Sequence, residues 1–224
     1  MMKTSVRASR MEPSATLAVV NKAKALKYEG KPVISFGAGE PDFDSPAAAA
    51  SCAERAIKEG KTHYTQSNGI LELREAVASY YSGRFGLDYP ADQVIIGPGA
   101  KPLIYGSLAS LVDPEDEVLV FSPAWVSYVE QIRLLDGRAS IVDTVTTGNV
   151  PLASKVAEAV TPRTVGMLIN TPNNPTGAVY GEETLREIAE IALEHDLWII
   201  NDEIYERLVY GNSTHLNIAT LVPE

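Results

Sequence analysis

Hydrophobic positions along this chain follow two spacings that alternate. Short apolar runs predict strands at residues 33–36, 93–96, 117–121, 139–142, 165–169, 198–200 and 208–210. Apolar residues at helical spacing predict helices at residues 14–29, 45–59, 70–85, 101–112, 126–135, 152–159 and 182–194. Strands that alternate with helices are typical of βαβ units, so the pattern predicts an α/β fold with a mainly parallel sheet and helices on both faces, in three α/β/α layers.

Two polar clusters directly follow predicted strands. The first is the stretch Asn170-Thr-Pro-Asn-Asn-Pro-Thr-Gly177, and the second is Asn201-Asp-Glu-Ile-Tyr205. Because the carboxyl ends of parallel strands meet at one edge of a sheet, we expect the amide of Asn174, the carboxylate of Asp202 and the phenol of Tyr205 to converge in one crevice. Each residue alone has a simpler explanation: a loop amide, a turn-capping aspartate or a core tyrosine.

A glycine turn between a predicted strand and a helix forms a third candidate. The loop contains Gly97, Gly99 and Lys101 and leads into the predicted helix, so its backbone N–H groups could bind a phosphate at the helix start. A plain tight turn explains this loop about as well. It is not a dinucleotide fingerprint, because Pro102 occupies the third glycine position, and this counts against a nucleotide-binding oxidoreductase.

Composition narrows the function classes. Apolar residues make up 45% of the chain and charged residues 21%, and the net charge of −10 argues against a nucleic-acid-binding surface. Cys52 is the sole cysteine, so we expect no intrachain disulfide and a small buried thiol in its Ala-rich helix. No apolar run reaches the roughly 18 residues of a membrane span, and the N-terminus lacks a signal-peptide core, so a cytoplasmic location is expected. No metal site is predicted.

Taken together, the motifs resemble those of fold-type I enzymes that use pyridoxal phosphate, specifically the class I aminotransferases and most closely their bacterial aspartate aminotransferase subgroup. The matching segments are residues 13–16, 39–43, Tyr64, 69–70, 73–75, 99–101, 123–125, 173–177 and 202–205. The resemblance covers essentially the whole chain. It implies an N-terminal arm at residues 1–44 and an incomplete large, cofactor-binding domain at residues 45–224, with the C-terminal small domain absent.

The resemblance also implies roles around the cofactor. Asp202 would pair with the pyridine nitrogen, Asn174 and Tyr205 would bind the ring oxygen, and Trp125 would stack on the ring. Backbone groups of Gly99, Ala100 and Lys101 would hold the phosphate.

Further implied roles concern substrate and partner. Gly39, Trp125 and Asn174 would contact the substrate, and Thr16, with Ser14, would close over a dicarboxylate. Tyr64 would reach the phosphate of a neighbouring subunit, which implies a homodimer with shared sites. Aspartate with 2-oxoglutarate is the expected substrate pair, although Ala109 stands where some relatives carry a lysine for the distal carboxylate; a broader or aromatic preference is the alternative.

One expected group is missing. In the resembled family a lysine that forms a Schiff base with the cofactor lies just beyond the segment at which this chain ends, and no lysine occurs between Tyr205 and Glu224. We therefore expect the chain to be inactive alone, with an exposed strand edge and apolar face. Two alternatives stay open: another pyridoxal-phosphate enzyme, such as a lyase or synthase, and a non-catalytic binding module on the same fold.

Overall fold

The computed structural model describes residues 3–11, 15–37, 39 and 43–222, with the side chains of Ala15 and Thr16 left out. The predicted Ser14 contact lies outside the described residues. The chain divides into two compact units, Glu12–Ile70 and a larger one formed by Met1–Met11 and Leu71–Glu224. Each is described by itself, and the predicted boundary after residue 44 stays a prediction.

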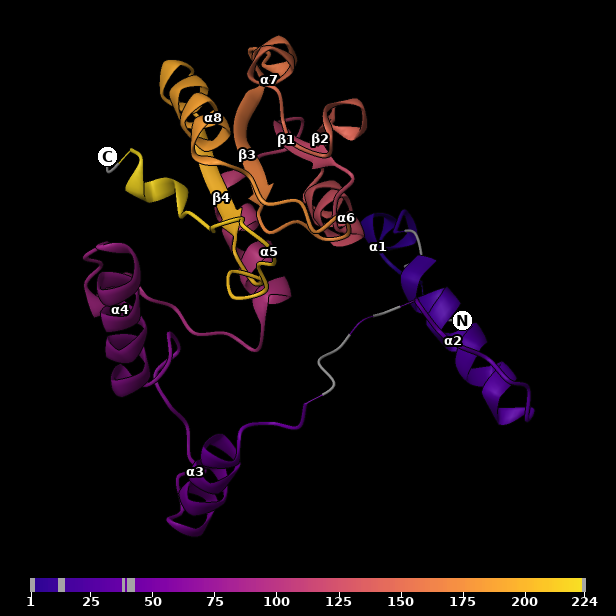
Figure 1. The fold of residues 1–224 in the computed structure, drawn as a ribbon, viewed down its shortest axis with the longest axis vertical. Coiled ribbons are helices and arrows are strands. Elements are labelled where there is room, and N and C mark those ends of the chain that lie inside the picture. Colours follow the sequence, from indigo (N-terminus) through magenta and orange to yellow (C-terminus); the bar gives the residue numbers. More distant parts are fainter. Residues whose placement is uncertain (1–2, 12–14, 38, 40–42, 223–224) are drawn as a thin grey trace. The chain divides into compact units, whose positions relative to one another are not determined.

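The larger unit is built on a four-stranded parallel sheet (Figure 1). Its strands are β1 (Glu117–Ser122), β2 (Arg138–Asp143), β3 (Thr164–Asn170) and β4 (Trp198–Asp202), in the order β2-β1-β3-β4. Its helices are α1 (Val6–Ser9), α4 (Leu71–Phe85), α5 (Ala100–Leu111), α6 (Val126–Leu134), α7 (Ala153–Ala159) and α8 (Glu182–Glu194), with short 3-10 turns η1 (Ala91–Gln93), η2 (Val145–Thr147) and η3 (Ile218–Thr220).

Two apolar clusters cover the two faces of the sheet. Successive strand residues point to opposite faces, so Leu119 and Met167 pack with residues of α7 and α8, whereas Val120 and Leu168 pack with residues of α5 and α6. The helical partners are Val156, Leu185 and Ile188 on one face and Ile104, Leu108 and Ile132 on the other. The predicted three-layer α/β/α architecture is confirmed.

Three predicted strands do not form. Residues 33–36 and 208–210 are irregular, and residues 94–96 follow η1 as a segment outside the sheet. Val94 has strand-like angles, with φ of −102° and ψ of 129°, yet no described strand pairs with it. Apolar composition gives a segment its preference for extended backbone, but a strand also requires a neighbour for its N–H and C=O groups.

The smaller unit contains α2 (Ala15–Tyr28) and α3 (Ala47–Lys58). Gly37 approaches α2 so closely that an added Cβ would lie 3.0 Å from Val19. The prediction of a buried Cys52 is wrong: its thiol is exposed, because α3 buries none of residues 47–58, all of them described. Within the described part of the chain, no helix has the length and apolar character needed to cross a membrane.

Candidate active site

Two neighbouring strands deliver polar residues to the same edge of the sheet. Asn170 ends β3 and Asp202 ends β4, and the two are paired across the ladder. The Asn170 side chain donates from Nδ2 to the backbone oxygen of Asp202 at 2.9 Å. The ends of β3 and β4 are therefore joined directly beside the predicted crevice.

The loop after β3 is held by its own side chains. Asn170 Oδ1 accepts the backbone N–H of Asn174 at 2.7 Å, and Asn173 Oδ1 accepts from both the N–H and the hydroxyl of Thr176. Asn173 is buried and has a structural role in the loop. The side chain of Asn174 instead reaches Tyr205, with 3.4 Å between its Nδ2 and the phenol oxygen.

The Asp202 carboxylate has a donor on each oxygen. The Tyr128 hydroxyl donates to Oδ2 at 2.7 Å, and the Ile204 N–H donates to Oδ1 at 3.1 Å. Burial, followed by the charge of Asp202, raises the pKa of Tyr128 well above its ordinary value, so this phenol remains a donor. The carboxylate therefore has a fixed orientation at the end of its strand.

Sequence reasoning missed Tyr128, and it included Asn170 in the first polar cluster without giving it a role. A signal for Tyr128 existed, because it follows Trp125, the residue before α6, by three residues, which is about one helical turn. The two rings lie edge to face, 5.3 Å apart between centroids at 85°.

The glycine loop opens α5 at the same edge. Gly99 precedes the helix with φ of 96°, a left-handed conformation that favours glycine, and no side chain caps the first turn. The first N–H groups of a helix have no acceptor within it and are available to a ligand. Gln131 Nε2 donates to the Lys101 backbone oxygen at 2.8 Å, and the Lys101 ammonium lies 4.9 Å from the Trp125 ring centroid.

These residues line a cavity of about 260 Å³. It is formed by Ala100, Lys101, Trp125, Tyr128, Asn170, Asn174, Asp202, Ile204 and Tyr205. Six predicted residues thus share one pocket, with Gly99 adjacent in the chain. Thr16, Gly39 and Tyr64 belong to the unit Glu12–Ile70, and their placement at this pocket stays a prediction.

Comparison with known proteins gives one family. The family described as Aminotransferase class I and II matches residues 31–224. The probable aspartate/prephenate aminotransferase of Thermus aquaticus is 43% identical over 221 residues, which are 98% of this chain and 57% of that protein. The aspartate aminotransferase of Bacillus subtilis is 41% identical over 98% of this chain and 56% of that protein.

Comparison with solved structures points to the same family. The aspartate aminotransferase from Thermus thermophilus with maleate superimposes with a TM-score of 0.96 at 42% identity, over 100% of this chain and 59% of that one. An alanine aminotransferase from Pyrococcus furiosus gives a TM-score of 0.93 at 32% identity, over 98% of this chain and 56% of that one. The chain spans less than two thirds of the length of these relatives. Its architecture is that of the fold-type I transferases, and the chain belongs to the class I and II aminotransferase family.

Proposed function

We propose that this chain forms the pyridoxal-phosphate pocket of an aminotransferase that moves an amino group between aspartate and 2-oxoglutarate. The observation that carries the proposal is the doubly hydrogen-bonded Asp202 carboxylate, which lies in one cavity with the start of α5, Trp125 and Tyr205. The printed names of the relatives support the aminotransferase reaction and aspartate as a substrate.

The donor set fits the cofactor group by group. The uncapped N–H groups of Ala100 and Lys101 suit a phosphate, since a helix start carries partial positive charge. The Asp202 carboxylate suits a protonated pyridine nitrogen, and the Tyr205 hydroxyl with the Asn174 amide suits the ring oxygen. The indole of Trp125 provides an aromatic wall for a flat ring.

Each of these residues then has a chemical task. The cofactor supplies an electron sink when it is bound. Asp202 holds a proton at the ring nitrogen, and Tyr128 holds Asp202 in the orientation that this task needs. Tyr205 and Asn174 orient the ring oxygen, and Trp125 keeps the plane of the ring fixed and excludes water from one face.

We also propose that the 224-residue chain binds the cofactor but does not catalyse transamination by itself. Among the described residues, the lysine that lines the cavity is Lys101, and its ammonium lies against the Trp125 ring. A general base for the substrate's Cα proton is therefore expected from outside these residues. We also propose a cytoplasmic location, and a homodimer to which Tyr64 contributes across the subunits, as the family resemblance implies.

The test is cofactor binding by the purified chain. Equilibrium dialysis should show saturable binding of pyridoxal phosphate to wild type, and Asp202→Asn should bind about 10- to 100-fold more weakly, because a charge-assisted hydrogen bond of about 1.5–3 kcal/mol is lost. Equal affinity in the two proteins would remove Asp202 from its proposed role, and no binding to wild type would refute the pocket itself.

Borohydride reduction followed by peptide mapping tests the second half of the proposal. We expect no stoichiometric lysine adduct. One adduct at Lys101 would show that the chain has its own covalent chemistry with the cofactor and would contradict the proposal of an inactive chain.

A lyase or synthase on the same fold remains the second candidate, because its cofactor contacts would be the same. The names of the relatives favour transamination. Assay of the longest available form of the protein with aspartate and 2-oxoglutarate distinguishes them, since only a transaminase converts one into oxaloacetate and the other into glutamate.

A further inference from the structure

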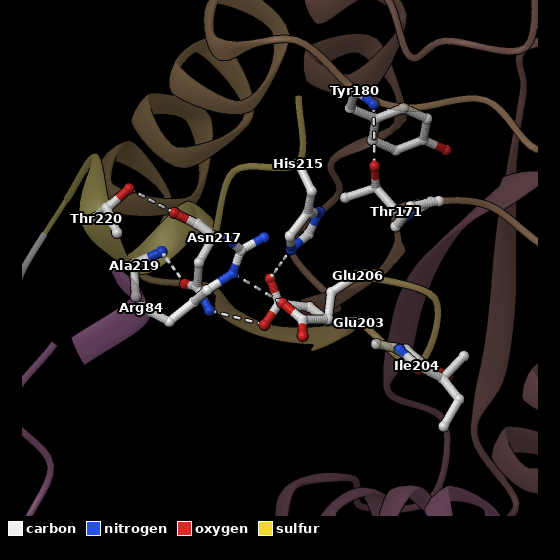
Figure 2. Close-up of polar contacts among 12 residues, drawn as sticks. Arg84, Thr171, Tyr180, Glu203, Ile204, Glu206, His215, Asn217, Ala219 and Thr220 are labelled. Carbon is white, nitrogen blue, oxygen red and sulfur yellow. Dashed lines mark hydrogen bonds and ion pairs between the residues drawn. The ribbon is translucent and has the colours of Figure 1, made fainter. Parts of the chain in front are cut away.

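Glu203, the residue after Asp202, makes a separate buried contact. Its side chain is 9% exposed, and each carboxylate oxygen has its own partner: His215 Nε2 lies 2.7 Å from Oε1, and Asn217 Nδ2 donates to Oε2 at 2.7 Å (Figure 2). A buried carboxylate is costly unless hydrogen bonds compensate for lost water. Asp202 lines both the 260 Å³ cavity and a second cavity of about 470 Å³, whereas Glu203 lines the second and not the first.

The two partners of Glu203 are themselves fixed. His215 is 5% exposed and packs edge-on against Phe85, at 6.0 Å between centroids. Asn217 caps η3 by accepting the Ala219 N–H at 2.9 Å, and Ile218 of that turn belongs to the core cluster shared with α8 (Figure 2). His215 Nδ1 is buried with no partner in the described part of the chain, so the polar interaction of this ring is directed at Glu203.

Glu203 also lies between two residues of the candidate active site. The chain turns directly after β4: the Ile204 N–H donates to Asp202 Oδ1, and the Glu206 N–H donates to the Glu203 backbone oxygen at 2.9 Å. A shift of this turn would move both the Asp202 carboxylate and the Tyr205 hydroxyl.

The side-chain contacts that Glu206 makes at the other end of this turn are weaker. Glu206 contacts Tyr80 and Arg207 and lies 3.5 Å from Arg84, but the two arginine side chains are 63% and 39% exposed. Exposed ion pairs contribute little because water and salt screen them. The Glu203 contacts therefore restrain the turn from its buried side, in addition to the contacts that Tyr128 and Asn170 make with Asp202.

We propose that the Glu203–His215–Asn217 cluster is a positioning element of the pocket: it holds the turn so that Asp202 and Tyr205 face the cavity. The three side chains do not line that cavity and act through their neighbours. The link to cofactor binding rests on the proposed function, whereas the effect on the turn does not.

The first test needs no cofactor. In His215→Leu, amide hydrogen exchange at Ile204 and Glu206 should speed up about tenfold or more relative to amides of β1 and β3, because the turn opens locally. His215→Gln should restore slow exchange, since its amide N–H reaches a similar position. His195→Leu, at an exposed histidine after α8, is the matched control and should change nothing.

A second variant guards against misfolding. Asn217→Ser keeps a side chain able to cap η3, but its hydroxyl is too short to replace the amide that reaches Glu203, so exchange should also rise at Ile204 and Glu206. Unchanged exchange at these amides in the folded variants would overturn the proposal. An equal rise across β1 and β3 would overturn it too, because it would show general destabilisation only.

Cofactor affinity provides the second readout. Partners that orient a ligating side chain are typically worth 10–100-fold in affinity at metal sites, so we expect His215→Leu and Asn217→Ser to weaken pyridoxal-phosphate binding about tenfold, with recovery in His215→Gln. Unchanged affinity despite faster exchange would refute the positioning role. If wild type binds no cofactor, the proposed function fails, and the exchange data alone decide whether Glu203 orders the turn.

Discussion

The hydroxyl of Tyr128 is the sharpest single-atom test of how Asp202 is held. Tyr128→Phe removes one oxygen and leaves the ring in place, so no large cavity forms at a residue that is 2% exposed. What is lost is a 2.7 Å hydrogen bond to a carboxylate. Such bonds contribute about 1.5–3 kcal/mol to stability.

We expect the stability lost in Tyr128→Phe to lie near the lower end of that range. Asp202 is only partly buried and keeps the Ile204 N–H on its other oxygen, so water can partly replace the lost donor. We expect the free energy of unfolding to fall by about 1.5–2 kcal/mol. Cofactor affinity should fall as well, because the carboxylate loses the contact that sets its orientation.

Urea unfolding followed by circular dichroism measures the effect, with the dependence on urea concentration expected to be unchanged. Tyr180→Phe is the matched control: this tyrosine is 1% exposed, burial alone raises the pKa of its hydroxyl, and that hydroxyl has no hydrogen-bond partner among the described residues. We expect a change below about 0.5 kcal/mol there. Equal losses in the two variants would refute the reasoning, since the cost would then come from packing and not from Asp202.

Three further outcomes follow from the geometry. Gly166→Ala should destabilise the protein by about 1–3 kcal/mol, because the added Cβ would lie 2.1 Å from the ring of Trp198 on β4. Gly106→Ala, at an exposed position of α5, should be neutral or stabilising, and equal urea midpoints for the two variants would contradict this reasoning. Thr171→Val should cost about 1–3 kcal/mol in urea unfolding, because it leaves the buried Tyr180 N–H without its acceptor (Figure 2), and a wild-type midpoint would disprove the need for that acceptor. Burial and nearby carboxylates raise the pKa of Tyr81 to about 12 from an ordinary 10.0. The unfolded chain therefore loses this proton at a lower pH than the folded chain, and the free energy of unfolding should fall as the pH rises above about 10. An ultraviolet titration in which all tyrosines ionise together near pH 10 would contradict this prediction.

The predicted strands that formed are those whose local pattern and pairing partners are both present. The apolar runs of β1, β3 and β4 and the amphipathic spacing of α8 carry their own preferences, and each found a neighbour in the sheet or core. Residues 94–96 have the same apolar character but no paired strand among the described residues. A run of residues does not reveal whether its hydrogen-bonding neighbour exists.

The candidate site, like the fold, was predicted only in part. Asn174, Asp202 and Tyr205 were placed together correctly, because the order of strands and loops already brings them to one sheet edge. The side chains that hold the ends of this site in place were not predicted. Tyr128 comes from α6 and His215 from a segment after β4, and only packing brings them within 2.7 Å of Asp202 and Glu203.

The amino-acid sequence by itself determined the alternation of strands and helices, the polar residues at the strand ends and the family to which their motifs point. These features depend on short-range periodicity and on chain order, which are visible in one dimension. The tertiary structure alone decided which side chains hold Asp202 and Glu203, which apolar runs pair into a sheet, and that Cys52 is exposed. Those outcomes depend on distances between residues far apart in the chain, and hydrogen bonds and burial are set by such distances.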